Sequence, residues 1–314
     1  MKRRLKDAFK RLLFRLYRLG SRLGVHVMPA HYYVGAVDIA ELERTRDQWQ
    51  RKSDLPGLNI DLDKQLSALR NVCLPFRDEY ASNTAYHEAV AASSGPGYGY
   101  VEAQTLHAVI RHCRPARIIE VGSGVSTHCM RTALELNRRD GAAETTMTCV
   151  EPYPSKRLLQ TPGITLLQQP VQAVAVEVFR VLQAKDFLFI DSSHTVKPAS
   201  DVNYLLLEVL LVLKPGVILH IHDIYLPYDY QRNVLKTFMH WSETSLLRAY
   251  LAHYNRVAIL FCLSHLHYEH RAQVQEVFPD YDPAPDDNGL NLPTVRPFEQ
   301  PRGHFPSSIY LETR

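Results

Sequence analysis

The stretch Arg117-Ile-Ile-Glu-Val-Gly-Ser-Gly-Val-Ser-Thr127 decides the fold, because an apolar run carrying a carboxylate turns through two glycines into a helix. Gly122 and Gly124 let the backbone adopt conformations that other residues disfavour, so the chain can pass close to a ligand. Ser126 and Thr127 supply hydroxyls that can cap the following helix. The pattern predicts a strand, a tight turn and a helix that together bind a nucleotide-type cofactor.

The spacing of the glycines bears on which cofactor the loop binds. A dinucleotide-binding fingerprint reads Gly-x-Gly-x-x-Gly and would place its third glycine at position 127. Thr127 therefore argues against NAD, and an oxidoreductase is kept only as an alternative interpretation. A tight strand-to-helix connection that binds nothing is the structural alternative.

The next two apolar runs follow at the intervals of a βαβ chain. The run at 147–150 ends in Glu151, about 30 residues after Glu120, where a carboxylate can bind ribose hydroxyls. A solvated acid at a strand end is the alternative for Glu151. The run at 164–169 predicts a third strand that ends at Gln169.

The fourth and fifth apolar runs are the clearest strands. Asp186-Phe-Leu-Phe-Ile-Asp191 is continuously apolar between its acids, as expected of a strand buried on both faces of a parallel sheet. Ser192-Ser-His194 follow it. A helix is predicted from about residue 198 to 213, because a proline opens it and Lys-Pro-Gly ends it. The fifth strand runs from Val217 to His222 and ends at Asp223.

Four motifs in this part of the chain resemble the bacterial class I methyltransferases that use S-adenosylmethionine (SAM), in particular macrocin O-methyltransferase-like and cephalosporin hydroxylase-like proteins. In order along the sequence they are Phe189-Ile-Asp-Ser-Ser-His194, Asp201-Val-Asn-Tyr204, Leu213-Lys-Pro-Gly216 and His220-Ile-His-Asp-Ile224. The similarity covers about residues 98 to 263. A weaker likeness extends upstream through His31-Tyr-Tyr33 and Leu55-Pro-Gly-Leu-Asn-Ile60.

The resemblance implies a doubly wound α/β fold with a mostly parallel, Rossmann-like sheet of seven strands and a helical N-terminal extension. A late strand is expected at 256–263 and a final, antiparallel one at 308–311. The implied reaction is transfer of a methyl group from SAM to a hydroxyl of a small-molecule or saccharide acceptor. A non-catalytic scaffold of this fold in envelope polysaccharide assembly and a family-related hydroxylase are the alternatives.

The resemblance also assigns roles to residues of this sequence. The residues expected to hold SAM are Glu120, Gly122, Ser123, Gly124 and Ser126 for its methionine part, Glu151 for the ribose, Gln169 near the adenine, and Asp191. The residues expected to face the acceptor are Asp191, His194, His222 and Asp223. His194 is the predicted general base, because its usual pKa lies near neutrality. A hydrogen bond within its own loop is the alternative for His194.

A divalent metal is a further expectation at the same edge of the sheet. Asp191 ends the fourth strand, and His222 and Asp223 end the fifth, so the three side chains should converge there. The family's metal-dependent members place acidic ligands at these strand ends, whereas His222 departs from that pattern. One imidazole beside two carboxylates suits manganese, iron or zinc better than magnesium. Without a metal, both acids would bind cofactor or substrate, or cap loops.

The composition fits one medium-sized catalytic domain with extensions. The chain has 314 residues, of which 46% are hydrophobic, and its net charge of +3 is too small to argue for nucleic acid. Its five cysteines are scattered and odd in number, which favours a reducing, cytoplasmic compartment. The expected parts are a basic helix at 1–30, a helical extension at 31–97, and the methyltransferase domain at 98–314 with a proline-rich insertion at 278–306.

The first 23 residues predict an amphipathic helix with one apolar and one basic face. Such a helix can lie on an anionic membrane surface, which would make the protein peripheral on the inner membrane face. Packing on its own domain or on a partner subunit is the alternative, and a homo-oligomer stays open.

Three further segments have two interpretations each. The tyrosine-rich loop 224–231 can stack on a sugar or aromatic acceptor or pack on its own domain. The glycine-rich segment 93–100 can cover the cofactor or act as a hinge. His265, His267 and His270 lack the spacing of a zinc site and are expected to be ordinary loop and helix-start residues.

Overall fold

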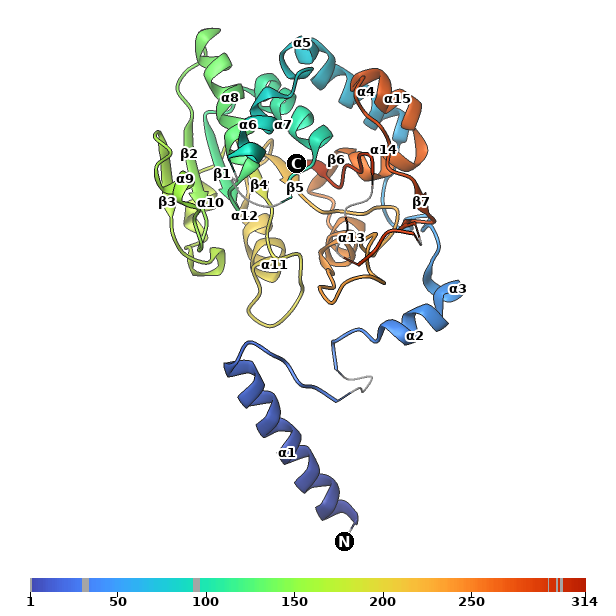
Figure 1. Ribbon diagram of the computed structural model, residues 1–314. Helices are drawn as coiled ribbons and strands as arrows, with labels where there is room; N and C mark the ends of the chain where they lie inside the picture. The colour runs from blue at the N-terminus through green and yellow to red at the C-terminus, as the bar shows by residue number, and fades with distance from the viewer. Residues whose placement is uncertain (1, 30–33, 93–96, 293, 298, 300–301) are drawn as a thin grey trace. The chain divides into compact units, whose positions relative to one another are not determined.

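The computed structural model describes residues 2–29, 34–92, 97–292, 294–297, 299 and 302–314, which form two compact units (Figure 1). The first unit, residues 1–49, contains α1 (Lys2–Arg22), α2 (Ile39–Arg44) and α3 (Arg46–Trp49). Asp38 starts α2, because its carboxylate accepts a hydrogen bond from the Glu41 N–H at 3.2 Å. His31-Tyr-Tyr33 lies outside the described residues.

The second unit, residues 50–314, is built on one sheet of seven strands. In spatial order the strands are β3 (Ile164–Leu167), β2 (Thr146–Val150), β1 (Arg117–Val121), β4 (Phe187–Ile190), β5 (Ile218–Ile221), β9 (Ile309–Thr313) and β6 (Val257–Cys262). The five strands from β3 to β5 are parallel, whereas β9 is antiparallel to both β5 and β6. The predicted doubly wound sheet with an antiparallel final strand is confirmed. The strand order reverses between β1 and β4, which is where open α/β sheets bind ligands.

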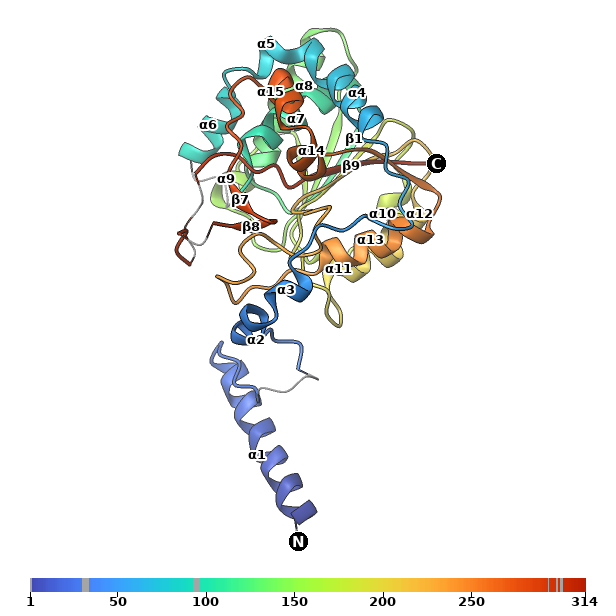
Figure 2. The same cartoon turned by 90° about the vertical axis from the view of Figure 1, so that its right-hand side faces the viewer.

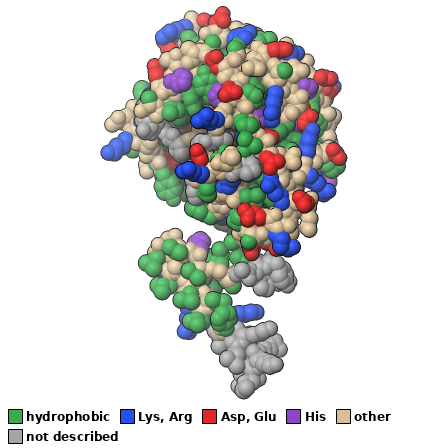
Figure 3. All heavy atoms as spheres, turned by 45° about the vertical axis from the view of Figure 1, so that its right-hand side comes forward, with side chains coloured by type: hydrophobic (Ala, Val, Ile, Leu, Met, Phe, Trp, Pro, Cys, Tyr) green, Lys and Arg blue, Asp and Glu red, His purple; other side chains and the backbone are tan. Residues whose placement is uncertain are grey.

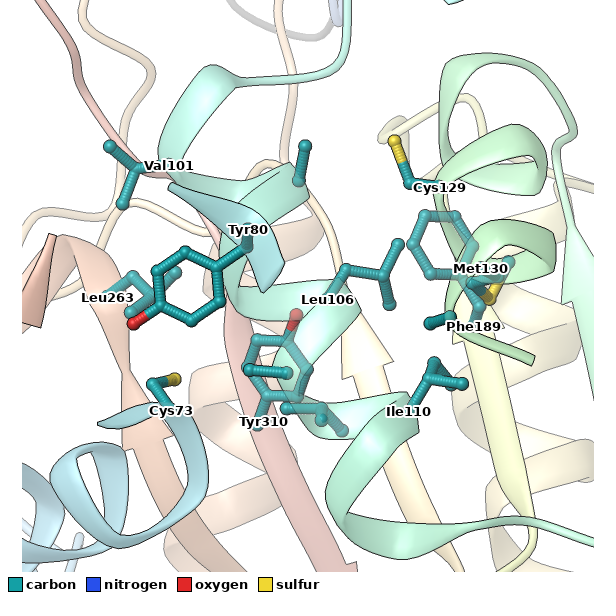
Figure 4. Packing of buried hydrophobic residues seen from close by; sticks show 14 of the residues in the cluster. Cys73, Tyr80, Val101, Leu106, Ile110, Cys129, Met130, Phe189, Leu263 and Tyr310 are labelled. Carbon is teal, nitrogen blue, oxygen red and sulfur yellow. The ribbon is translucent and has the colours of Figure 1, made fainter. Parts of the chain in front are cut away.

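Helices cover both faces of the sheet (Figure 2). One face carries α4 (Leu62–Cys73), α7 (Tyr100–Cys113), α8 (Val125–Arg139) and α15 (Arg271–Val277), and the other carries α10 (Glu177–Arg180), α12 (Leu210–Val212) and α13 (Glu243–His253). The side chains of β4 alternate between the two cores, since Phe189 packs under α7 and α8 (Figure 4) while Leu188 packs on the other side. Burial on both faces explains why this strand is an unbroken apolar run.

The predicted helix at 198–213 begins later than expected. It consists of α11 (Asp201–Tyr204), a π-helical segment (Leu205–Val209) and α12. Ser200 is its N-cap, because its hydroxyl accepts a hydrogen bond from the Asn203 N–H at 3.2 Å. A serine cap three residues from a main-chain donor outweighs the proline as the start signal.

The shorter elements complete the second unit. They are η1 (Leu74–Phe76), α5 (Arg77–Tyr80), α6 (Thr84–Ala91), α9 (Lys156–Leu159), η2 (Val171–Ala173), α14 (Leu263–Glu269), β7 (Asp286–Asp287) and β8 (Leu290–Asn291). Residues 50–97 were expected to form part of a separate extension, but α4 packs on β6 and α7 within the same unit as the sheet.

The insertion at 278–306 is more ordered than its prolines suggest. Its strands β7 and β8 pair as a small antiparallel ribbon, and Tyr281, Ala284 and Leu290 are buried. Residues 293, 298, 300 and 301 lie outside the described part of this segment. No helix in the described ranges combines the length and the apolar character that crossing a bilayer requires.

Candidate functional site

A cavity of about 320 Å³ opens at the carboxyl ends of the parallel strands. Its walls come from the segments that follow β1, β2, β4 and β5 and from those that precede α7 and α13. The lining residues are Gly97, Tyr98, Gly122, Ser123, Gly124, Val125, Ser126, Glu151, Asp191, Ser192, His194, Asp223 and Trp241. The cavity therefore contains most of the residues that the sequence singled out.

The glycine loop sits where β1 meets the segment after β4. Gly122 has a φ of 78°, and a Cβ on this residue would lie 1.9 Å from the Asp191 carbonyl oxygen. Its N–H donates to the Val150 carbonyl at 3.1 Å, which ties the loop to the end of β2. Only glycine fits between these two strand ends, so the loop can turn directly into α8.

Glu120 lies beneath this loop and does not line the cavity. Its carboxylate accepts hydrogen bonds from Ser126 Oγ at 2.8 Å, Thr127 Oγ1 at 2.6 Å and Cys149 Sγ at 3.3 Å. Burial raises the pKa of Glu120 to about 7, although these donors act in the opposite direction. Glu120 was expected to hold the cofactor; the structure instead gives it the role of holding the loop from inside.

The capping of α8 is also divided differently from the sequence expectation. Thr127 Oγ1 accepts the Gly124 N–H at 3.0 Å, as a capping residue does, while it donates to Glu120. Ser126 Oγ is committed to Glu120, so Ser126 does not cap the helix, although the residue borders the cavity. A third glycine at position 127 would remove both hydrogen bonds of Thr127, which is why this loop departs from the dinucleotide pattern.

Glu151 and Ser123 form the outer part of the glycine end. The Glu151 carboxylate accepts the Ser123 N–H at 3.2 Å and the Tyr153 N–H at 2.8 Å, which holds it at the cavity wall after β2. Ser123 Oγ is buried and lacks a protein hydrogen-bond partner in the described structure. Gln169, predicted to lie near the adenine, is not among the residues that line this cavity.

The opposite end of the cavity is built around His194. His194 Nε2 lies 3.2 Å from Asp191 Oδ1 and 3.5 Å from Asp223 Oδ2, and Nδ1 lies 2.9 Å from Glu243 Oε2. One imidazole thus contacts three carboxylates. His194 and Asp223 both have a positive φ, 56° and 54°, a conformation that few residues other than glycine adopt.

The loop that carries His194 is fixed on two sides. Asp201, in the first turn of α11, accepts hydrogen bonds from the Ser193 N–H at 2.8 Å and the Ser193 hydroxyl at 2.6 Å. The His194 carbonyl accepts the N–H groups of Ser242 and Glu243 at 2.8 and 3.1 Å, at the start of α13. Main chain and side chain of His194 therefore both dock on α13.

The charge of His194 argues against its predicted role as general base. Burial favours the neutral ring, but the hydrogen bonds with Asp191 and Glu243 and the charge of Asp223 prevail, and the pKa is raised well above its usual value. The pKa of Asp191 is lowered, since the charges of His222 and His194 outweigh its burial. At neutral pH His194 is an imidazolium that holds carboxylates together.

His222 lies behind the cavity wall. Its Nδ1 is 3.1 Å from Glu102 Oε1 and its Nε2 is 3.8 Å from Asp223 Oδ2. Burial opposes its charge, but Asp223, Asp191 and Glu102 raise its pKa to about 10. His222 was expected to face the acceptor, whereas the structure places it in the layer that supports Asp223.

Three residues of this end were missed from the sequence. Glu102 on α7 and Glu243 on α13 are buried acids, and Trp241 lines the cavity with its ring centroid 4.7 Å from that of His194. Glu102 stands in the first turn of an otherwise buried helix, and Glu243 directly follows a serine. An acid in such a position usually signals a helix start, so neither pattern indicated a site.

The predicted metal site is not supported. Among the described residues no group of three His, Cys, Asp or Glu side chains is arranged to hold a metal ion. The reason is visible in the contacts: the imidazolium of His194 lies between Asp191 and Asp223, where a cation shared by these acids would lie. The protein's own cation neutralises them.

The aromatic and histidine segments mostly serve packing. Tyr225 and Tyr228 are buried, and Tyr225 donates its hydroxyl to Asp223 Oδ1 at 3.0 Å, so the tyrosine loop is packed on its domain. His265 and His267 are buried in α14, and burial lowers the pKa of each to about 4. Of the glycine-rich segment, Gly97 and Tyr98 border the cavity, while residues 93–96 lie outside the described structure.

Comparisons with known proteins agree with this architecture. Residues 119–224 match a family model described as a methyltransferase domain. An uncharacterized protein from Archaeoglobus fulgidus is 28% identical over 186 residues, which cover 55% of this chain and 80% of that protein. The sheet order and the domain match together show the class I methyltransferase fold.

Two solved structures resemble the chain at low identity. An O-methyltransferase from Bacillus cereus in complex with SAH superposes with a TM-score of 0.41 and 12% identity, over 79% of this chain and 100% of that one. A putative caffeoyl-CoA O-methyltransferase from Staphylococcus aureus gives 0.40 and 13%, over 63% and 93%. Neither likeness indicates an acceptor for this chain.

Proposed function

We propose that this protein is a SAM-dependent methyltransferase that methylates a hydroxyl of a small molecule or saccharide. The observation that supports it most is the two-ended cavity, with the glycine loop and Glu151 at one end and a carboxylate–imidazolium cluster at the other. Its volume of about 320 Å³ is within the range of small-molecule sites. The match of residues 119–224 to a methyltransferase domain supports the same activity.

The glycine end has the groups that SAM requires. Glu151 presents a carboxylate at the wall, where it can accept hydrogen bonds from two ribose hydroxyls. Ser123 Oγ is a buried hydroxyl without a protein partner, which is the kind of group that a polar ligand satisfies. Gly122 and Gly124 leave the backbone open to close approach.

The other end can orient the acceptor and take its proton. When bound, SAM supplies the methyl group on a sulfonium that a nucleophilic oxygen attacks. Because His194 and His222 both have raised pKa values, the proton acceptors facing the cavity are the carboxylates of Asp191 and Asp223. Asp223 is held in place by hydroxyl donors, Tyr225 at 3.0 Å and Ser307 at 2.8 Å. His194 fixes the spacing of both carboxylates.

Trp241 indicates the shape of the acceptor. Its indole lines the cavity beside His194 and Asp223, so a flat apolar surface adjoins the charged groups. Such a wall suits a pyranose or aromatic ring whose hydroxyl points toward the carboxylates. This arrangement supports a ring-bearing hydroxyl compound as the acceptor.

The cofactor assignment is tested by calorimetry with SAM, its demethylated product SAH, and NAD. Wild type should bind SAM and SAH but not NAD, and Glu151→Ala should weaken SAM binding by roughly 10- to 100-fold, since charge-assisted hydrogen bonds contribute about 1.5–3 kcal/mol. Glu144→Ala is the matched control, because Glu144 is an exposed acid just before β2, the strand that Glu151 follows. Unchanged SAM affinity in folded Glu151→Ala would refute the ribose assignment, and NAD binding would refute the class.

The chemical assignment is tested by following SAH formation over a panel of hydroxylated ring compounds and saccharides. Asp191→Asn and Asp223→Asn should bind SAM within a few-fold of wild type, and the variant that lacks the proton acceptor should lose about 10²–10⁴ in kcat. Asp229→Asn, an exposed acid on the following loop, should stay at the wild-type rate. Wild-type turnover in both site variants would show that neither carboxylate takes the proton.

A further inference from the structure

The helix α1 presents an uncovered apolar stripe. Phe9, Leu12, Leu16, Leu19 and Leu23 recur every three or four residues, so they share one face of the helix and its end. These five side chains are between 43% and 75% exposed. Figure 3 shows hydrophobic side chains gathered on the described part of this segment. Apolar surface of this extent on one helix marks an interaction site.

The other faces of α1 carry its basic residues. Lys10, Arg11, Arg15, Arg18 and Arg22 are exposed and fall outside the stripe. By sequence, residues 2–22 contain nine of the chain's 36 Lys and Arg residues and one of its 33 acids. That leaves 27 basic and 32 acidic residues, a net charge of −5, in the remainder, although the whole chain carries +3. The positive charge of this protein is therefore concentrated in one helix.

We propose that α1 is a docking surface for an anionic membrane, on which it lies parallel to the bilayer plane. The apolar stripe would enter the boundary between headgroups and acyl chains, while the Arg and Lys side chains reach the anionic headgroups. Both halves of the helix surface then have a partner of matching chemistry. The proposal does not depend on the methyltransferase activity, because it rests on residues of the first unit alone.

The charge of α1 favours an anionic membrane over a second copy of the helix as its binding partner. The stripe also has the spacing of a coiled-coil seam, but pairing two such helices would bring together two segments of net charge +8, each with a single acid at Asp7. Like charges at this density oppose self-association, whereas an anionic bilayer gains from them. The observations therefore favour lipid over a copy of the chain.

The test mixes the full-length protein with vesicles and measures how much protein sediments with them. The vesicles contain phosphatidylcholine alone or phosphatidylcholine with about 30% of the anionic lipid phosphatidylglycerol. Binding is expected only to the anionic vesicles, and it should weaken as NaCl is raised from about 20 to 500 mM because of screening. Failure to bind anionic vesicles at low salt, or equal binding to both compositions, would overturn the proposal.

Matched variants separate the two faces of α1. Leu12→Gln with Leu16→Gln should reduce the vesicle partition coefficient more than tenfold, because both stripe side chains lose their apolar contact. Phe14→Gln, which alters an apolar residue that is 59% exposed but off the stripe, should keep wild-type binding. Arg11→Gln with Arg15→Gln should reduce anionic binding roughly fivefold per residue.

Sedimentation equilibrium tests the alternative that α1 pairs with a second copy of the chain. A monomer without vesicles supports the lipid assignment, whereas a dimer that Leu12→Gln with Leu16→Gln abolishes would show that α1 pairs with a second copy. SAM calorimetry on the same variants should give wild-type affinity, which distinguishes failure of this proposal from failure of the proposed activity. Equal vesicle binding by wild type and the double Leu variant would also refute the role of the stripe.

Discussion

Two carboxylates near opposite ends of the cavity, Glu120 under the glycine loop and Asp191 on the cavity wall, have opposite electrostatics. Glu120, in β1, receives hydrogen bonds from hydroxyl and thiol groups only, and its pKa is raised to about 7. Asp191, directly after β4, lies near the charged rings of His222 and His194, which outweigh burial and lower its pKa. The strand that contains Glu120 and the strand that precedes Asp191 are neighbours in the sheet.

The difference shows how strongly the neighbouring groups of a carboxylate decide its charge. Neutral donors compensate a carboxylate only in part, so Glu120 titrates near neutrality. The charge of His222, together with the hydrogen bond and charge of His194, keeps Asp191 ionised throughout the physiological range. The carboxylate at the glycine end is therefore suited to hold a loop, whereas the ionised carboxylates at the His194 end are suited to accept a proton.

The largest expected effect comes from removing the shared cation. His194→Gln should lower the free energy of unfolding by about 3–5 kcal/mol, because Asp191, Asp223 and Glu243 would lose their common partner. Urea unfolding at pH 7 measures it. His128→Gln is the control, since His128 pairs with the exposed Glu88 and should cost less than about 1 kcal/mol. Equal losses in the two variants would remove the basis of the comparison.

A smaller effect is expected from pH at Glu120. Its pKa rises from the usual 4.5 in the unfolded chain to about 7 in the fold, so the folded protein loses stability as pH increases through this window. Glu120→Gln lacks that loss, and its stability relative to wild type should increase by up to about 3 kcal/mol between pH 5 and 8.

Urea unfolding at intervals of one pH unit measures this difference for Glu120→Gln. The exposed Glu144→Gln should run parallel to wild type over the same range. Parallel curves for Glu120→Gln as well would mean that Glu120 is ionised in the fold at pH 5, contrary to its environment of neutral donors.

The smallest expected effect distinguishes the two ends by their hydroxyls. Ser123 and Ser192 each have a buried hydroxyl without a protein partner, one in the glycine loop and one next to Asp191. Ser123→Ala should weaken SAM binding by about 1 kcal/mol, whereas Ser192→Ala should leave it unchanged. Calorimetry measures both, and a larger effect from Ser192→Ala would place the cofactor at the other end of the cavity.

The same two ends differ in how far the sequence predicted them. The glycine loop and Glu151 stand within about 30 residues of each other, as a βαβ unit requires, so a linear pattern was enough to place them at one cavity. The apolar runs likewise predicted the individual strands of the sheet, whereas its doubly wound arrangement was implied by the resemblance to the methyltransferases. The sequence did not predict that Glu120 lies under the loop, because a sequence pattern does not show whether a strand-end side chain points out of the sheet edge or under the loop.

The charged end depends on contacts that no linear pattern contains. Glu243 reaches His194 across 49 residues, and Glu102 reaches His222 from a helix that precedes the sheet. The general-base hypothesis for His194 assumed the usual pKa of an imidazole, whereas the acids around His194 raise its pKa well above that value. The metal hypothesis correctly brought Asp191 and Asp223 together, but it did not predict that the ring of His194 lies between them.

Ser307 has a consequence for the order in which the molecule is assembled. Its N–H donates to Glu102 at 3.0 Å across 205 residues, and its hydroxyl donates to Asp223 at 2.8 Å. Because β9 lies between β5 and β6, β6 cannot join the sheet until β9 has been synthesised and has paired with β5. Contacts so distant in sequence form slowly and late in folding. A ribosome-bound chain that lacks β9 would already contain every residue of the glycine loop, but it could not yet form the complete His194 end of the cavity.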